Sequence, residues 1–326
     1  MRRTTERHWL TRLALCLVLG ACAEAPPAPT PLTVAVFKVE PRQLRLTPRL
    51  LARLHRYATS VVETHAAFRT VPREQLLRTL RKRRVRAERD CYSARCQAKL
   101  GRRSLGANRA VSLQVTRNLL GQCDVFGLLQ NLGTRSNEQK AHARAGCSEE
   151  EIAQSLGRVV CRLAASASTA EARDAAESRC LAQADYLWVE QRLAEFGDDR
   201  KPLDERRLAE TALDLRREYD RIIRTGALPW SVVAVCRTGR LYEELARRLG
   251  GPAADEAQAP RGTGEPSETA RQQQEAAQRL RAAPYVDQAR QIYTACLHQA
   301  KQAKLSHPQV EEARQRLHAL DSPAAP

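Results

Sequence analysis

Cysteine is the residue type in this sequence with the greatest capacity for chemistry, because its thiol can bind a metal, act as a nucleophile or form a disulfide. The chain has ten cysteines in 326 residues. That count is high for a cytosolic protein and ordinary for an exported one, since disulfides persist in oxidising compartments. The cysteine content therefore predicts an exported protein with structural disulfides.

Two pairs of cysteines predict disulfides. Cys123 and Cys147 lie in two expected strands joined by a turn at Gly133–Ser136. A hairpin centred on that turn places them opposite one another, within disulfide range; the alternative is two buried free thiols. Cys91 and Cys96 are five residues apart and could close a small loop. The alternative of half a zinc site is disfavoured, because no histidine lies close and no second pair has zinc-ribbon spacing.

The cysteines of the second half have a different interpretation. Cys236 and Cys296 lie on expected helical faces among apolar residues, so we expect them to be small core residues. Cys161 and Cys180 flank an expected helical turn near residue 166, which would leave them several residues out of register. We therefore do not pair Cys161 with Cys180, and the sequence assigns no pairing to the four cysteines of this half.

A search for catalytic motifs finds none. The sequence has no Gly-x-Ser-x-Gly, no His-Glu-x-x-His, no phosphate loop and no dinucleotide fingerprint. Its seven histidines are scattered and do not form a ligand set. We expect no active site, no metal and no cofactor, and the sequence predicts that the protein is not an enzyme.

The N-terminus has the features of a secretory signal. Arginines precede an apolar stretch over Leu13–Leu19 that is too short to span a bilayer. A cysteine directly after Leu-Gly-Ala resembles the signal of bacterial lipoproteins, which implies that Cys22 carries the lipid, including palmitate, and becomes the mature N-terminus. The alternative is an ordinary signal cut after Ala23. We expect residues 1–21 to be the signal and the protein to be lipid-anchored in the cell envelope, at the outer membrane facing the periplasm.

Charge divides the rest of the chain into two expected domains. A Pro-rich tether covers residues 22–31. Residues 32–164 contain 26 basic and 10 acidic residues, a net charge of +16, whereas residues 165–326 contain 24 and 25, a net charge of −1. Such an asymmetry predicts two domains with different partners.

The first domain is predicted to be an α/β domain with a mixed sheet and flanking helices. A continuous apolar run from Leu32 to Val39 is typical of a buried strand, and Pro48 is placed to begin a helix. Three later strands, expected at 109–117, 123–131 and 137–147, form an antiparallel meander. Ser148 and Glu151 then predict a capping box at the start of another helix.

The second domain is predicted to be all-α. Its expected helices are Ser168–Phe196, Leu203–Thr225, Pro229–Leu249, Ser267–Ala282, Pro284–Ala303 and Pro308–Leu320, with a flexible insertion at 251–266.

Two parts of this helical domain are similar to one another. Aligning Leu215–Tyr219 with Ala289–Tyr293 gives two units 74 residues apart, about twice the ~34-residue tetratricopeptide period. The pattern resembles degenerate tetratricopeptide repeats, and the alternative is plain helical-bundle packing. A surface of that kind binds proteins. Aromatic groups are the expected contacts: Trp188, Tyr219, Trp230 and Tyr293.

A basic run in the first domain predicts an anionic partner. It consists of Arg81, Lys82, Arg83, Arg84 and Arg86. Export and the scarcity of aromatic residues argue against nucleic acid. Anionic lipid headgroups or peptidoglycan fit the same charge; the alternative is a solvated helix without a partner.

The order of motifs over residues 32–164 resembles a group of envelope lipoprotein domains. The resemblance rests on Val34-Ala35-Val36-Phe37, on a helix ending near Leu100-Gly101, and on Leu105-Gly106-Ala107 before a strand. The group comprises the curli-secretion lipoproteins, the lipoprotein activators of peptidoglycan synthases and the N-terminal domain of the Tol-Pal propeller protein. The two cysteine pairs make the sequence similar to lipoproteins of predatory and gliding delta-proteobacteria. The resemblance implies a non-enzymatic scaffold or regulator of an envelope machine; the alternative is a subunit of an oligomeric envelope secretion complex.

Overall fold

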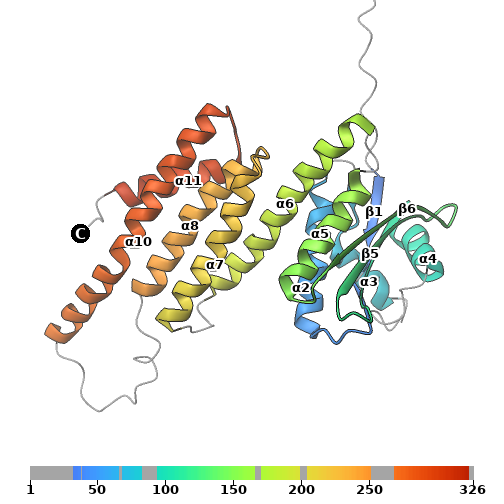
Figure 1. Ribbon diagram of the computed structural model, residues 1–326, viewed down its shortest axis with the longest axis horizontal. Helices are drawn as coiled ribbons and strands as arrows, with labels where there is room; N and C mark the ends of the chain where they lie inside the picture. The colour runs from blue at the N-terminus through green and yellow to red at the C-terminus, as the bar shows by residue number, and fades with distance from the viewer. Residues whose placement is uncertain are drawn as a thin grey trace, which may run out of the picture. The chain divides into compact units, whose positions relative to one another are not determined.

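A mixed β-sheet with flanking helices comes first in the chain and is followed by a multi-helical region (Figure 1). This is the predicted fold class, which is confirmed. The computed structural model describes residues 32–37, 39–65, 68–82, 94–165, 170–198, 204–250 and 268–322. Within it, Leu32–Pro326 form one unit.

The sheet has the strand order β3-β1-β4-β5-β6, and β2 pairs with β4. Its strands are β1 (Leu32–Val36), β2 (Glu40–Arg42), β3 (Phe68–Thr70), β4 (Arg109–Arg117), β5 (Cys123–Asn131) and β6 (Ser136–Ala145). The pairs β1–β3, β1–β4 and β2–β4 are parallel, whereas β4–β5 and β5–β6 are antiparallel. The expected meander is therefore present, and β4 and β5 have the predicted bounds.

Helices cover the two faces of the sheet (Figure 1). Strand side chains alternate between the faces, so Val111 and Leu113 of β4 join one core while Ala110 joins another. Helices α2 (Pro48–Glu63) and α5 (Glu149–Ala165) cover the first face. Helices α3 (Arg73–Lys82) and α4 (Ala94–Leu105) cover part of the second.

Local signals in the sequence set several helix ends. The side chain of Thr47 accepts a hydrogen bond from the backbone N–H of Leu50, and Pro48 follows as the first residue of α2. The predicted capping box of α5 is present, because Ser148 and Glu151 exchange hydrogen bonds. The hydroxyl of Ser148, together with its backbone N–H, donates to the Glu151 carboxylate and holds the pKa of that carboxyl below its usual range.

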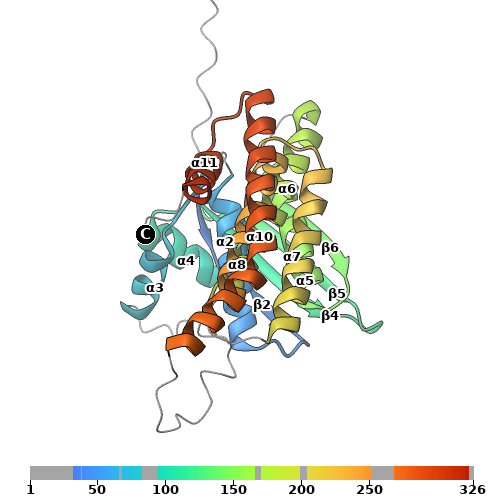
Figure 2. The ribbon, with the colours of Figure 1, turned by 90° about the vertical axis from the view of Figure 1, so that its left-hand side faces the viewer.

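The helical region contains α6 (Ala170–Phe196), α7 (Glu205–Arg224), α8 (Trp230–Gly250), α10 (Glu268–Gln302) and α11 (Pro308–Asp321). Helix α8 packs against both α7 and α10. Figure 1 shows the three side by side, and in Figure 2 α10 lies in front of α8. The two aligned units have one feature in common. The hydroxyl of Tyr219 donates to Glu190 at 2.6 Å, and that of Tyr293 donates to Glu243 at 2.8 Å. A tetratricopeptide relationship remains a prediction.

Helix α10 is continuous, so the predicted break at Pro284 is wrong. An internal proline removes one backbone hydrogen bond and crowds the preceding turn. Further along α10, the side chains of Ala289, Tyr293 and Cys296 are buried in a core shared with α8 and α11. We attribute the continuity of the helix to this packing, since most helical stability comes from tertiary contacts.

Two disulfides in the structure differ from what the sequence predicted. Cys161 bonds Cys180 with the Cα atoms 5.6 Å apart, and Cys236 bonds Cys296 with the Cα atoms 5.1 Å apart. The first was missed because α5 and α6 are offset along their axes, whereas a symmetric turn was assumed. The second was missed because helical positions alone do not show which helices face one another.

The Cys236–Cys296 bond should contribute strongly to stability, because it closes a loop of 60 residues. The chain-entropy model gives about 4 kcal/mol for such a loop. We expect Cys236→Ala with Cys296→Ala to lower the free energy of unfolding by about that amount, measured by urea denaturation. Cys161→Ala with Cys180→Ala, which opens a loop of 19 residues, is the matched control and should cost about 3 kcal/mol. Unchanged urea midpoints in both would contradict the prediction.

Candidate binding surface at one end of the sheet

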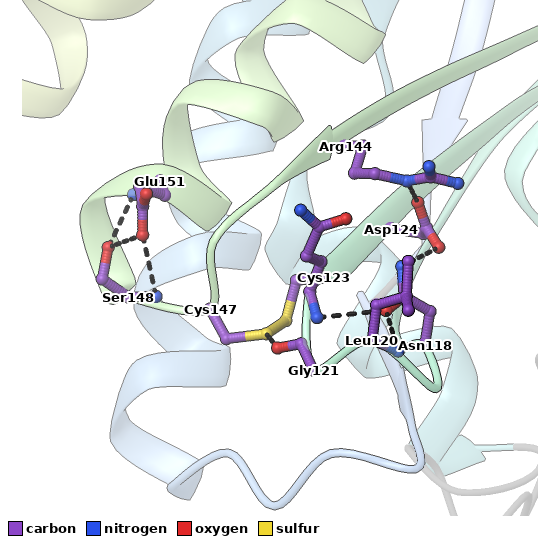
Figure 3. Close-up of a disulfide and its surroundings, with 10 residues drawn as sticks. Asn118, Leu120, Gly121, Cys123, Asp124, Arg144, Cys147, Ser148 and Glu151 are labelled. Atoms are coloured by element: carbon purple, nitrogen blue, oxygen red, sulfur yellow. Dashed lines mark hydrogen bonds and ion pairs between the residues drawn. A yellow bond between two sulfur atoms is a disulfide. The ribbon is translucent and has the colours of Figure 1, made fainter.

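The turn that joins β4 to β5 is held by a dense set of hydrogen bonds. The backbone N–H of Gly121 donates to the carbonyl of Asn118 at 3.1 Å, and the N–H of Asn118 donates to the carbonyl of Gln122 at 2.9 Å. The side-chain oxygen of Asn118 also accepts from the N–H groups of Leu120 and Gln122, each at 3.0 Å (Figure 3). Gly121 has a φ of +77°, as expected for the last residue of a short hairpin loop. Asn118 and Gly121 therefore determine the conformation of the turn.

Two leucines form the tip of this turn. Leu119 is 105% exposed and Leu120 is 80% exposed. The central positions of a turn with Asn first and Gly fourth accept most residue types, so the backbone does not require leucine at either. In the sequence, Asn118–Gly121 lies between the expected strands 109–117 and 123–131 and indicates a turn. The signal that could have identified the tip is a pair of large apolar residues between two turn-forming residues.

A disulfide fixes the base of the turn. Cys123, the first residue of β5, bonds Cys147 with the Cα atoms 5.1 Å apart (Figure 3). The Sγ atom of Cys147 also lies 3.4 Å from the carbonyl oxygen of Gly121. The bond joins the predicted cysteines, but the predicted register is wrong, because Cys123 faces Ala145 and not Cys147. Cys147 lies two residues beyond the end of β6. The turn is centred earlier in the chain than predicted, because Asn131 already faces Ser136.

Asp124 links the turn to β6. One carboxylate oxygen accepts from Nε of Arg144 at 2.8 Å and lies 3.0 Å from Nε2 of His142. The other oxygen accepts from the side-chain amide of Asn118 at 3.1 Å. The hydrogen bond from Arg144, with those from His142 and Asn118, lowers the pKa of Asp124 to about 2. Asp124 therefore holds the turn and β6 together as a charged group.

An aromatic side chain is exposed on the sheet beside this cluster. A Cβ on Gly127 would touch Val159 and Leu163 of α5, so the adjacent Phe126 points to the opposite face. Phe126 is 40% exposed, and its ring stacks on that of His142 with the centroids 4.6 Å apart. At this end, the face of the sheet opposite α5 is partly open to a partner.

Several predicted site residues lie outside the described residues, namely Cys22, Cys91, Arg83, Arg84 and Arg86. Cys96 is disulfide-bonded. Arg81 and Lys82 end α3, and Lys82 is exposed. The predicted Cys91–Cys96 bond and the anionic-surface role of the basic run remain predictions.

The aromatic residues expected to contact a protein are mostly in the interior. Trp188, Tyr219 and Tyr293 are at most 3% exposed, so their predicted role as contact residues is wrong. Trp230 is partly exposed, with its ring near those of Tyr186 and His307. The error arose because these helices bury more than one face against their neighbours, which a sequence without contacts does not show.

The described residues include no group of three His, Cys, Asp or Glu side chains that could hold a metal ion. Within the same ranges, no helix is long and apolar enough to cross a membrane. A shallow depression of about 520 Å³ lies between α10 and α11, lined by Leu297, Arg314, Leu317, His318, Asp321 and Ser322.

Comparison with known proteins gives likenesses to solved structures only. The C-terminal domain of LpoB from Salmonella enterica superposes with a TM-score of 0.31 and 13% identity, covering 37% of this chain and 87% of that domain. The same domain from Escherichia coli gives a TM-score of 0.32 and 12% identity, covering 41% and 94%. The resemblance to LpoB is therefore partial. No family model matches the chain, and no curated protein matches its sequence.

Acid should weaken the fold through Asp124. Its pKa is about 2 in the folded protein, below the usual 3.8, so its stabilising contribution is complete above about pH 4 and is lost as the pH falls from 4 to 2. We expect Asp124→Asn to destabilise the protein by about 1–3 kcal/mol at pH 7 and to flatten the loss of stability over that pH interval. Urea midpoints measured from pH 7 to pH 2 provide the check. The exposed Asp174→Asn should keep the wild-type profile, and an Asp124→Asn profile parallel to wild type would contradict the assignment.

Proposed function

We propose that the protein is a lipid-anchored lipoprotein of the bacterial cell envelope that acts as a scaffold or regulator by binding, without catalysing a reaction. The observation that carries the proposal is the set of disulfides at Cys123–Cys147, Cys161–Cys180 and Cys236–Cys296. Bonds of this kind form in oxidising compartments and are rare in the reducing cytosol. They fit the secretory signal that precedes Cys22.

Five of these six cysteines are buried in the cores, and Cys147 is half-buried against one of them, which supports a structural role over a catalytic one. Cys123 and Cys161 are fully buried, and Cys180 is 4% exposed. Cys236 and Cys296 are likewise buried beside Tyr293. Catalytic disulfides exchange with an attacking thiolate and need access to it, so buried bonds of this kind suit a protein that must stay folded in the envelope.

The contacts of two glutamates in the helical region also support a binding role over a catalytic one. Glu190 in α6 accepts from both Tyr219 and Arg237. Glu243 in α8 accepts from Tyr293 and Arg316. Such groups are engaged in holding helices together, whereas a general acid or base must be free to exchange a proton with a substrate.

The lipid anchor can be tested directly. We expect Cys22→Ser to abolish incorporation of radiolabelled palmitate and to leave an uncut precursor, because the thiol that carries the lipid is gone. Cys16→Ser, a change within the signal itself, is the matched control and should label normally. A Cys22→Ser protein that still takes up palmitate, or still fractionates with membranes in high salt, would rule out the lipoprotein assignment.

The basic charge of residues 32–164 supports a second contact, with an anionic surface. We expect the soluble chain, begun after Cys22, to co-sediment with vesicles containing anionic lipid or with peptidoglycan sacculi at low salt and to be released at high salt. Exposed charges are screened over about 8 Å at physiological ionic strength. Replacing Arg81 and Lys82 with Glu should reduce the bound fraction at low salt. A bound fraction that changes neither with salt nor with these substitutions would contradict the proposed contact with an anionic surface.

A further inference from the structure

We infer that the Leu119–Leu120 turn is the contact point for a partner protein with an apolar pocket edged by carboxylates. The inference rests on the proposed function as a binding protein and names the surface and the chemistry of its partner. The sequence predicted the main protein contact in the helical region. The contact inferred here lies instead at the end of the sheet that carries the β4–β5 turn.

The β5–β6 hairpin of the same sheet shows that a turn organised by asparagine does not require leucine at its tip. In the β5–β6 turn the side-chain oxygen of Asn131 accepts from the N–H groups of Gly133 and Thr134, at 2.9 and 3.2 Å. That asparagine organises its turn much as Asn118 organises the first. The tip of the second turn, Gly133–Arg135, is polar and exposed. Of two turns of similar construction, one therefore exposes ordinary polar residues and the other exposes two leucines.

The leucines are presented on a rigid support. Backbone N–H groups that donate to the side-chain oxygen of Asn118, the left-handed Gly121 and the Cys123–Cys147 bond all fix the backbone around the leucines. A surface that is already ordered loses little conformational entropy when it binds, so more of the apolar contact appears as affinity. Isolated exposed leucines need no explanation, but two adjacent ones on a braced turn are suited to insertion into a pocket.

Cations at the same end of the sheet define the rim of that pocket. Arg117 is exposed, and one guanidinium nitrogen lies 3.7 Å from the position a Cβ would take on Gly121. Strand β2 runs parallel to β4 with Arg42 opposite Thr116, so the exposed Arg45 follows β2 at this end. Neither Arg117 nor Arg45 forms an ion pair within the described ranges. Two available cations beside an apolar tip fit a pocket with acidic residues at its edge.

The topology favours a protein over the membrane that holds the anchor. Strand β1 is parallel to β4, and Val34 lies opposite Arg109, the first residue of β4. The described chain thus begins at the end of the sheet opposite the leucines. A nine-residue strand such as β4 spans about 30 Å, and the ten residues from Cys22 to Pro31 reach at most about 35 Å when fully extended. The leucines would touch that membrane only if the tether ran back along nearly the whole sheet.

Photo-crosslinking in living cells tests the contact with the full-length protein. Benzoylphenylalanine is placed at residue 120, and at residue 134 in the second turn as the matched control. We expect residue 120 to give a discrete adduct with another protein and residue 134 to give none. The adduct partner is then identified by mass spectrometry, purified, and its dissociation constant for the chain is measured.

Leu119→Ser with Leu120→Ser should raise that dissociation constant by about tenfold or more, as expected for central apolar contacts, while Thr134→Ala leaves it unchanged. Because both leucines are solvent-exposed, the urea unfolding curve of the variant should match wild type, which separates lost contact from lost fold. Arg117→Glu should slow association and reduce its salt dependence.

Adducts only with lipid, only with a second copy of this chain, or none at all would overturn the inference. A partner whose dissociation constant is unchanged by the leucine substitutions would also overturn the inference. Failure here is distinguishable from failure of the proposed function, because palmitate labelling at Cys22 does not depend on Leu119 or Leu120.

Discussion

Helix α6 must bury two different faces at once, and both parts of the fold depend on it. Cys180, Ala184 and Trp188 belong to the core beneath the sheet. Leu193 and Phe196, further along the same helix, belong to the core of the helical region. The sheet and the helical stack are therefore connected through a continuous helix and not through a linker. The Cys161–Cys180 bond ties the first part of that helix to α5.

Because α6 is shared, the chain should not be divided at the charge boundary between residues 164 and 165. The division at 164/165 remains a prediction about which partners each part binds. As a place to cut the chain, however, it would separate Cys161 from Cys180 and expose the apolar face that carries Trp188. Arg53 of α2 also pairs with Glu195 near the end of α6 at 2.9 Å. Experiments on the intact chain are therefore more informative than experiments on the two fragments.

The sequence predicted best those features that depend on neighbouring residues. The bounds of β4 and β5 followed from apolar alternation and from the turn residues Asn118–Gly121. The capping box at Ser148 depends on a residue only three positions away. In each case the controlling interaction lies within one turn or one strand, so spacing alone is sufficient evidence.

Features that depend on distant segments were predicted less well, for the same physical reason. The predicted hairpin register was wrong by two residues, because Asn131 already faces Ser136 and the turn is therefore centred earlier in the chain than the prediction assumed. The burial of Tyr219 and Tyr293 depends on which helices pack together, and so does the bond between Cys236 and Cys296. The exposed leucines required both local and distant information. The turn residues indicate where Leu119 and Leu120 lie in the chain, but only the fold shows that they are exposed among the described residues.

Charge and apolar contact act over different distances, and the chain separates them. The net +16 of residues 32–164 attracts anionic groups over roughly a Debye length, whereas leucines gain free energy only when water is removed from direct contact. A basic surface alone holds many partners weakly and is weakened by salt. An apolar tip on a rigid turn adds selection by shape, because a partner must offer a pocket that accepts Leu119 and Leu120 together. Because β1 begins at the end of the sheet opposite Leu119 and Leu120, an anchor at Cys22, as proposed, would leave the turn free to select the partner.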